Sequence, residues 1–325
     1  MEILTFLLQV LALPLLSPLA VGIIRKFKAR MQNRVGATVL QPYYDLWKLF
    51  HKDEIISSDA SWVFRFSPYL IFAVTLVIGA SVPVITTVAP ALFSEMAAAA
   101  SVNLSFLATG DFIMIIYLFA LATFFLALAG MDTGSGFGGF GSSREMTMAA
   151  LAEGGLFFSL LVASVIAQTG NVLAMVESLQ YVPFQLYIPL LVAFIAFFIA
   201  LLAENSRFPV DNPATHLELT MIHEAMILEY SGKRLALIEW ASWTKLLIFI
   251  ALGANVFFPW GVATSFLPNM VFTSALLFMV KALCFLAAIA FIESTMAKFR
   301  IFRVPDLLFT SFVLSVIALA VTITF

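Results

Sequence analysis

Eight long apolar runs dominate the hydrophobicity pattern of the chain. Each is long enough to cross a hydrocarbon core of roughly 30 Å as an α-helix. The pattern predicts an all-α integral membrane protein with about eight transmembrane helices, organised as a single transmembrane domain over residues 1–325. The runs lie near residues 3–24, 67–89, 111–131, 146–167, 184–203, 237–260, 268–292 and 306–324.

Composition agrees with this pattern. Hydrophobic residues make up 62% of the chain and charged residues 11%, about half the charged fraction of a soluble domain. The one cysteine, Cys284, cannot supply a disulfide, a cysteine-ligated iron–sulfur cluster or a structural zinc site within this chain. The first apolar run has no basic segment before it and no clear cleavage site, so we expect a retained helix.

Most basic residues lie in alternate loops. Four segments hold 15 of the 17 Lys and Arg residues, and the loops between them hold none. The positive-inside rule therefore predicts that these four segments are cytoplasmic and that both termini lie outside. The cytoplasmic segments lie near residues 25–66, 132–145, 204–236 and 293–305.

The first of these segments contains a short amphipathic pattern. After Pro42, the residues Tyr43, Leu46, Trp47 and Phe50 recur at the spacing of one helical face. We expect a short helix in the cytoplasmic interface, which serves either as a positive-inside anchor or as a wall of a cavity or a docking surface for a soluble partner. The candidates for docking or cavity lining are Arg25, Arg30, Arg34, Gln41, Asp45, Trp47, Lys48, Arg207, His216 and His223.

The second cytoplasmic segment, GMDTGSGFGGFGSSREM, is rich in glycine. Gly134, Gly136 and Gly139 match G-x-G-x-x-G, but the motif follows a membrane helix and not a strand, so we exclude a dinucleotide site. The glycines are instead expected to permit tight turns and close backbone approach. Ser142 and Glu145 form a capping-box pattern, which predicts the start of the fourth helix.

The stretch AENSRFPVDNPATHLELTMIHEAMILEYSG, residues 203–232, is unusually polar for its place between two apolar runs. Asn212 before Pro213 predicts a helix start, and Gly232 predicts its end after Ser231. Glu218, Ala225 and Glu229 would share one stripe of this helix, and His216 and His223 another. The seven-residue spacing of the histidines does not suit a metal chelate.

Ionisable residues inside or beside the apolar runs are costly unless they have a use. Lys281 is near mid-span and Glu153 lies about two turns into its helix, so we expect both to face the bundle interior and to relay protons. For residues at helix ends, such as Glu239 and Glu293, we expect snorkelling or interface solvation. The proton-pathway candidates are Asp132, Glu145, Glu153, Glu204, Asp211, Glu218, Glu224, Glu229 and Lys281.

Two of the cytoplasmic loops resemble those of a known family. The stretch RMQNRVGATVLQPYYDLWKLFHKDEI is similar to the first signature of the H-type membrane subunits of NADH:quinone oxidoreductase (respiratory complex I). The stretch RFPVDNPATHLELTMIHEAMILEYSG is similar to the second signature of these subunits. The first match is carried by Arg34, Gly36, Gln41, Pro42, Asp45, Lys48, Leu49, Lys52 and Glu54, and the second by Arg207, Pro209, Asp211, Pro213, Glu218 and residues 229–232.

Within that family the glycine-rich segment and the 203–232 stretch look most like those of the membrane subunit of group 4 nickel–iron hydrogenases, of the formate hydrogenlyase and hydrogenase-4 component C type. The quinone enzymes usually carry several acids just after Asp-x-Pro, whereas Ala214 and His216 stand at two of those places here. This departure argues against a conventional quinone-binding chamber, although quinone binding stays open.

The resemblance implies a non-catalytic, proton-conducting membrane subunit with no cofactor of its own. Its implied partners are a cytoplasmic hydrogenase-like large subunit with a nickel–iron centre, a small iron–sulfur subunit and antiporter-like membrane subunits, with no nucleic acid. The implied location is the cytoplasmic membrane of a bacterium or an archaeon. Two alternatives stay open, a quinone-binding H-type subunit of complex I and a stand-alone ion transporter, and the absence of an internal repeat argues against the transporter.

Overall fold

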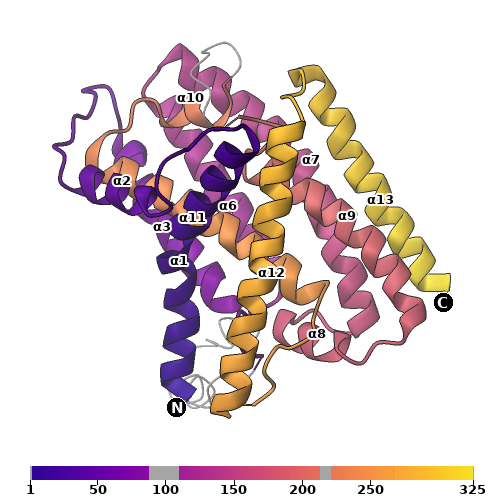
Figure 1. The fold of residues 1–325 in the computed structure, drawn as a ribbon. Coiled ribbons are helices and arrows are strands. Elements are labelled where there is room, and N and C mark those ends of the chain that lie inside the picture. The colour runs from indigo at the N-terminus through magenta and orange to yellow at the C-terminus, as the bar shows by residue number, and fades with distance from the viewer. Residues whose placement is uncertain (1, 88–109, 213–220, 266, 325) are drawn as a thin grey trace, which may run out of the picture.

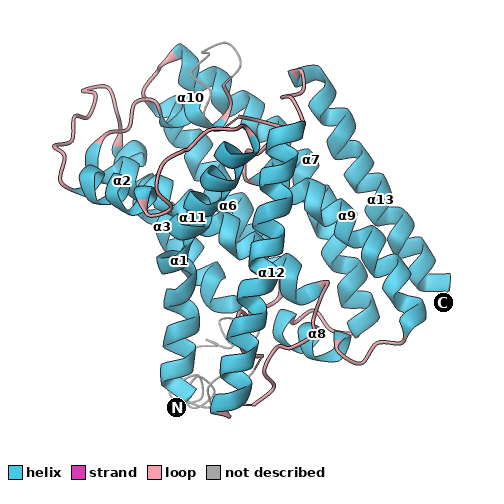
Figure 2. Ribbon diagram, viewed as in Figure 1, coloured by secondary structure: helices cyan, strands magenta, loops and turns pink. Residues whose placement is uncertain are grey.

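The structure is a computed structural model that describes residues 2–87, 110–212, 221–265 and 267–324. Within these ranges the chain consists of helices joined by loops, as Figure 2 shows, and eight helices are long and apolar enough to span a membrane. The predicted fold class is confirmed. The eight helices are α1 (Glu2–Met31), α3 (Trp62–Ser81), α6 (Phe112–Asp132), α7 (Gly136–Ala167), α9 (Tyr187–Glu204), α11 (Gly232–Val256), α12 (Pro268–Thr295) and α13 (Val304–Thr324).

Shorter helices lie at the two ends of the bundle. Helix α2 (Gln41–Phe50) is the expected amphipathic helix, and it lies at the same end as α10 (His223–Ile227) in Figure 1. Helix α8 (Val172–Leu179) lies at the other end of the bundle, where α1 begins and α13 ends. The single-turn helices η1 (Phe184–Leu186) and η2 (Ile301–Arg303) precede α9 and α13. The assignment of the α2 and α10 end to the cytoplasm stays a prediction.

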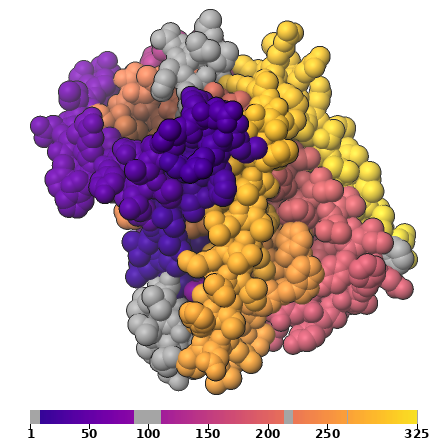
Figure 3. All heavy atoms as spheres, in the orientation of Figure 1, coloured from indigo at the N-terminus to yellow at the C-terminus, as the bar shows by residue number. Residues whose placement is uncertain are grey.

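Helix α11 forms the centre of the bundle. It packs against α1, α3, α9 and α12, and its stretch Ile248–Ala251 is completely buried. Helices α12 and α13 lie at the periphery and expose many apolar side chains, which is the pattern of surfaces that face lipid or neighbouring membrane subunits. Figure 3 shows how much of the molecular surface these two helices contribute on this side of the molecule.

Prolines inside the helices create tertiary contacts. A proline cannot bond the carbonyl four residues before it, so Pro18 frees the carbonyl of Pro14 in α1, and Trp240 Nε1 donates to that oxygen at 2.8 Å. In α3, Pro68 frees the carbonyl of Phe64, which accepts a hydrogen bond from the Tyr230 hydroxyl at 2.9 Å. These two hydrogen bonds connect α1 to α11 and α3 to the end of the polar stretch.

The predicted bounds of the second span are wrong by several residues. Helix α3 begins at Trp62, where the Ser61 hydroxyl accepts from Val63 N, and it ends at Ser81. Residues before proline favour extended backbone, and Val82 before Pro83 is extended, so the helix cannot continue to residue 89. The following buried segment is held by Gln9, whose amide donates to Val82 O and accepts from Thr86 N.

The predicted start of the fourth helix is also wrong. Helix α7 begins at Gly136 and not near residue 146, so the glycine-rich segment is mostly helix. Ser142 is buried inside α7 and donates to Ala127 O of α6 at 2.8 Å, which excludes the capping-box role. A Cβ on Gly138 would come within 2.1 Å of the Gly130 carbonyl oxygen. Close approach of α6 and α7 is therefore the reason for glycine at this position.

The helix predicted from Pro213 to Ser231 is wrong where the structure describes it. Only His223–Ile227 is helical, and Gly232 begins α11 with a φ of +56° instead of ending a helix. Contacts with distant groups set where this helix begins, since Arg144 donates to Met221 O and Asp211 Oδ2 accepts from the N–H of His223, the first residue of α10. Ala225 is buried and Glu229 is exposed. Pro213, His216 and Glu218 lie outside the described residues.

Candidate proton-transfer site

A small polar cavity lies inside the bundle. Its volume is about 40 Å³, enough for roughly three water molecules. The walls come from α3, α6, α7, α11, the end of α9 and the start of α10. The polar lining residues are Thr75, Thr123, Glu145, Glu204, Asn205, Ser206, His223, Ser242 and Lys245, and apolar residues such as Ile71 and Leu126 complete the lining.

An ion pair between α9 and α11 lines this cavity. Lys245 Nζ lies 2.8 Å from Glu204 Oε2, and the Glu204 side chain is only 3% exposed. The ammonium group also lies near the faces of the Phe119 and Phe249 rings, with 5.6 Å and 6.0 Å to their centroids. These contacts satisfy the lysine by charge and cation–π attraction. Glu204 Oε1 and Asn205 Oδ1 have no hydrogen-bond partner in the described part of the chain, and a cavity water would suit both.

Two carboxylates of α7 extend the charged region along one helix face. Glu145 lines the cavity and lies within electrostatic range of Lys245 and Glu204. Glu153, eight residues further along α7, interacts electrostatically with the same two residues. An eight-residue spacing places both acids on the same side of the helix. The structure therefore brings one predicted acid, Glu204, into contact with Lys245 and places two others, Glu145 and Glu153, within its electrostatic range.

Two ionisable groups of α10 lie between the cavity and the loop surface. Burial lowers the pKa of His223 to about 4, which the charge of Asp211 partly opposes, so His223 is neutral at neutral pH. Burial raises the pKa of Glu224 to about 7, and the negative charges of Glu239 and Asp211 contribute to this rise. Glu224 can therefore gain or lose a proton near neutral pH, as a relay group must.

Asp211 organises the segment before α10. Its carboxylate is 3% exposed and accepts from Lys298 Nζ at 2.6 Å, from Asn212 N at 2.8 Å and from His223 N at 3.3 Å. Lys298 follows α12 in the chain, so this cluster connects the segment between α12 and α13 to the polar stretch. Asp211 is thus a buried, well-partnered structural anion next to the cavity.

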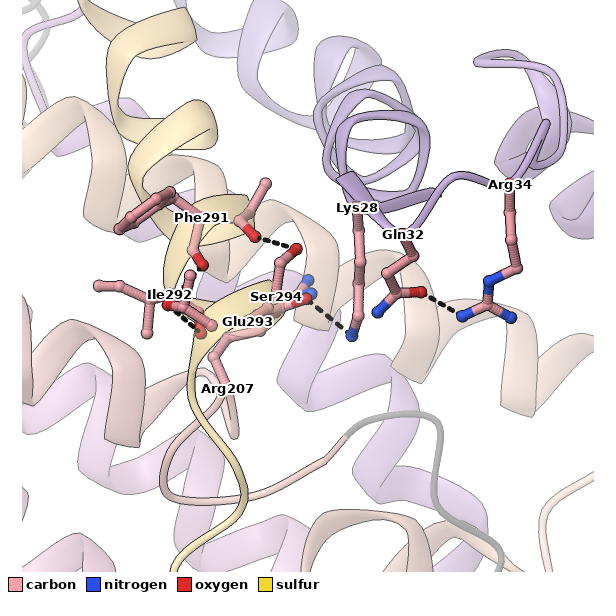
Figure 4. A network of polar contacts seen from close by, with 10 residues as sticks. Lys28, Gln32, Arg34, Arg207, Phe291, Ile292, Glu293 and Ser294 are labelled. Carbon is pink, nitrogen blue, oxygen red and sulfur yellow. Dashed lines mark hydrogen bonds and ion pairs between the residues drawn. The ribbon is translucent and has the colours of Figure 1, made fainter. Parts of the chain in front are cut away.

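Glu293 near the end of α12 forms a second buried cluster, drawn in Figure 4. Its side chain is 2% exposed and accepts from Arg207 Nη1 at 3.1 Å and from Lys28 Nζ at 3.3 Å. Lys28 also lies 4.8 Å from the centre of the Phe208 ring. The expected interface solvation of Glu293 is wrong, because the carboxylate ties α1 and the polar stretch to α12.

A further charged group connects α2 to the central helix. Asp45 accepts from Gln41 Nε2 at 3.0 Å and lies 3.6 Å from Arg25 Nη1. Arg25 also lies 6.0 Å from the Trp243 ring and interacts electrostatically with Glu239 of α11. These contacts dock α2 against α1 and α11.

Other predicted pathway residues lie away from the cavity. Asp132 accepts from Ser61 N and Phe64 N at the start of α3, so it caps that helix. Lys281 faces the protein interior as expected, but it donates to Phe258 O and the Asn255 side chain and forms no ion pair among the described residues. Glu229 is exposed.

Seven of the ten docking candidates divide into two groups, whereas Gln41 bonds Asp45 on α2 and His216 lies outside the described residues. Four basic side chains and Trp47, which is 69% exposed, lie at the surface, where a partner could reach them. Arg207 and His223 are instead drawn into the Glu293 cluster and the cavity lining. The four exposed basic residues are Arg25, Arg30, Arg34 and Lys48.

Sequence reasoning missed the base at the centre of the site. Lys245 is an isolated lysine within an apolar run, and so is Lys281, but the prediction chose Lys281 alone. The signal was present, and only the fold shows which lysine has acids around it. Thr75, Thr123 and Ser242 carried no distinguishing signal. No group of three His, Cys, Asp or Glu residues suited to a metal ion occurs in the described ranges.

A known family matches nearly the whole length of the chain. The sequence model of the family described as NADH dehydrogenase matches residues 3–324. The chain belongs to this family. Within it, the chain is 32% identical over 312 residues to formate hydrogenlyase subunit 4 of Escherichia coli, with 96% of each chain covered. It is also 32% identical to hydrogenase-4 component C of the same organism, covering 96% of this chain and 93% of that one.

Relatives in the respiratory enzymes of this family are more distant. The H-type subunit of the NADH-quinone oxidoreductase of Syntrophotalea carbinolica is 29% identical, covering 85% of this chain and 81% of the relative. Among solved structures, a chain of the membrane-bound sulfane sulfur reductase, an archaeal respiratory membrane complex, superposes with a TM-score of 0.81 at 19% identity, with 99% of each chain covered. The resemblance predicted from the two polar loops is confirmed, and the fold is that of a multi-pass membrane subunit.

Proposed function

We propose that this chain is the membrane-anchoring, proton-conducting subunit of an energy-converting, hydrogenase-like oxidoreductase complex. In this proposal it couples redox chemistry in a docked cytoplasmic arm to ion translocation and has no redox centre of its own. The observation that carries the proposal is the buried Glu204–Lys245 pair in a polar cavity that Glu145 and His223 also line. A buried pair of this kind is costly for stability alone, and intramembrane charges usually mark a proton or ion path.

The pair can relay protons because its two members depend on each other's charge. A proton that reaches Glu204 neutralises the carboxylate and removes the partner of Lys245. Glu145, within electrostatic range, becomes the nearest competing carboxylate for that ammonium group. Glu153 lies further along the same helix face and extends the path into the membrane. Cavity waters would carry the proton between carboxylates, since direct transfer requires hydrogen-bond distance.

The loop end of the site provides the connection to the arm. Glu224 exchanges protons near neutral pH and interacts electrostatically with Asp211 and Glu239. Asp211 and Glu293 bind cations from three different segments of the cytoplasmic end, through Lys298, Arg207 and Lys28. A change of charge in a docked redox subunit would act on this network and shift the proton affinity of the cavity acids.

The proposed partners follow from the relatives and from the exposed basic surface. One relative is named as a component of hydrogenase-4 and another as a subunit of formate hydrogenlyase. We accordingly propose a hydrogenase-like large subunit with a nickel–iron centre and a small iron–sulfur subunit at the cytoplasmic end, with antiporter-like membrane subunits beside the bundle. The proposed location is the cytoplasmic membrane of a bacterium or an archaeon.

The relation to the H-type subunits of NADH-quinone oxidoreductases supports a second candidate, a quinone-reducing complex with the same proton path. One experiment separates the two. The chain is isolated in mild detergent, the copurifying subunits are identified by mass spectrometry, and hydrogen evolution is assayed. Nickel–iron and iron–sulfur subunits with hydrogen evolution support the hydrogenase-like complex. An arm with flavin, bound quinone and no nickel supports the second candidate, and a stable isolated chain contradicts both.

A further inference from the structure

A larger groove lies on the outside of the bundle, apart from the charged cavity. Its volume is about 560 Å³, within the range of small-molecule sites. Its lining comes from α1, α12 and the segment after α1, and α1 and α12 run side by side in Figure 1. The lining residues are Ile23, Lys26, Phe27 and Arg30 of α1, Val39 of that segment and Leu283 of α12.

The groove is amphipathic along its length. Residues 23, 26, 27 and 30 share one face of α1, and Lys26 and Arg30 lie in its last two turns, before the helix ends at Met31. Phe27 is 43% exposed and Leu283 45% exposed, so the apolar walls are open to the outside. The helical rise places Leu283 about 18 Å from the end of α12 at Thr295. Cations thus lie at the membrane surface and an apolar channel extends below them.

The basic residues of the groove differ from their neighbours on the other faces of α1. Arg25 lies 3.6 Å from Asp45 and Lys28 lies 3.3 Å from Glu293. Neither Lys26 nor Arg30 takes part in an ion pair within the described ranges. Lys26 Nζ donates to Val35 O at 2.8 Å, which leaves two N–H groups for another acceptor. Two cations therefore face the groove with their charge uncompensated.

The wall at Val39 is fixed by a close backbone contact. A Cβ on Gly22 would come within 1.9 Å of the Val39 carbonyl oxygen, so only glycine lets this segment lie against α1. The Lys26 bond to Val35 O holds the same segment from its other side. The groove is consequently a formed feature of the fold and not a gap between mobile side chains.

We propose that this groove binds an anionic phospholipid, with its phosphate against Lys26 and Arg30 and one acyl chain along Ile23, Phe27 and Leu283. Basic pockets between transmembrane helices at the cytoplasmic surface bind anionic head groups, and an acyl chain matches the apolar walls. The bound lipid would brace the 31–40 segment, which Figure 3 shows next to α12. The proposal requires only that the chain spans a membrane, and it does not depend on the redox partner.

In the test, the purified complex in detergent is titrated with dioleoyl phosphatidylglycerol and, separately, with dioleoyl phosphatidylcholine. The bound lipid is measured by native mass spectrometry. Each basic residue at a membrane surface changes lipid affinity about fivefold, so K26A/R30A should weaken phosphatidylglycerol binding roughly 30-fold. The control R300A/R303A removes the same charge from exposed positions of the same end and should leave binding unchanged. Leu283→Trp should weaken binding of the acyl chain with no change of charge.

Three outcomes overturn the proposal. The first is equal binding of the two lipids, and the second is unchanged binding in K26A/R30A and Leu283→Trp. The third comes from a photo-crosslinking residue placed at position 283 in the intact membrane. If that residue captures a helix of a neighbouring subunit and no lipid, the groove is a protein interface. Capture of phosphatidylglycerol supports the proposal even where the K26A/R30A variant fails to assemble.

Discussion

Lys245 Nζ lies 2.8 Å from Glu204 Oε2, and the second oxygen of that carboxylate, Oε1, has no protein partner in the described part of the chain. The pair is held by charge on one side and left open to a polar cavity on the other. A buried ion pair that served only stability would be expected to have all its oxygens satisfied. This asymmetry suits a carboxylate that exchanges protons with water in the cavity.

Replacement of Lys245 should destabilise the protein through Glu204. Lys245→Met leaves a buried carboxylate without its cation, at a cost of about 3–5 kcal/mol. The double variant Lys245→Met/Glu204→Gln should recover most of the loss, because it removes the uncompensated charge. Thermal unfolding of the purified complex measures both. Equal stability of the single and double variants would show that the two residues are not energetically coupled.

Glu293 should hold the C-terminal ends of α1 and α12 together. Glu293→Gln leaves Arg207 and Lys28 without their shared carboxylate, at an expected cost of about 3 kcal/mol. The matched control is Glu177→Gln, which changes an exposed acid at the other end of the bundle and should cost less than about 0.5 kcal/mol. The midpoint of thermal unfolding in detergent compares them. A midpoint for Glu293→Gln equal to that of the control would rule out this role.

Glu224 should titrate near neutral pH. Its pKa in the folded protein, about 7, exceeds the ordinary value of 4.5 because burial disfavours the carboxylate. The stability that it contributes is therefore full below pH 4.5 and is lost as the pH rises through 7. The stability contribution of His223 depends on pH in the opposite direction. Its pKa of about 4 lies below the ordinary value of 6.5, so this contribution is full above pH 6.5 and is lost as the pH falls through 4.

Infrared difference spectroscopy tests the titration of Glu224 directly. The absorption of protonated carboxyl groups should decrease between pH 6 and 8 in the wild type, and this decrease should be smaller in Glu224→Gln because one of the titrating carboxyl groups is removed. Between pH 5 and 8 the wild type should lose at least about 1 kcal/mol of stability relative to Glu224→Gln. The prediction fails if the two proteins give the same infrared titration.

Docking of the soluble arm should depend on the exposed basic surface. Arg34 and Lys48 are exposed and do not line the groove between α1 and α12. The variant Arg34→Glu/Lys48→Glu reverses two charges and should release the soluble subunits at moderate salt, while the membrane subunits stay together. Subunit composition after affinity purification measures the release. Full retention of the arm at every salt concentration would exclude this surface as the docking site.

Much of the fold could be predicted because membranes impose simple rules. Apolar length gave eight spans and the spacing of Tyr43, Leu46 and Phe50 gave α2. The predicted helix bounds were wrong where contacts with residues distant in the sequence decide the local structure. Ser142 looks like a helix cap but bonds Ala127 of α6, and the short helix α10 begins at His223, where Asp211 accepts from its first N–H.

The site was predicted only in part, for the same reason. Acids near span ends could be recognised from sequence, and Glu145, Glu153 and Glu204 do interact electrostatically with one base. The base with which they interact could not be recognised from sequence, because Lys245 and Lys281 have similar apolar contexts. The two lysines differ only in their neighbours on other helices. Glu293 looked like an interface residue because its partners Lys28 and Arg207 are 265 and 86 positions away.

Proton translocation through the cavity is the central claim, and proton movement per turnover tests it most directly. The purified complex is reconstituted into liposomes, and internal acidification is recorded with a pH-sensitive dye while the redox reaction runs. Glu204→Gln keeps the shape of the side chain and removes its proton exchange, so we predict at least a tenfold lower proton yield per turnover with assembly intact. Glu177→Gln should behave as the wild type. A wild-type proton yield in Glu204→Gln would contradict the account.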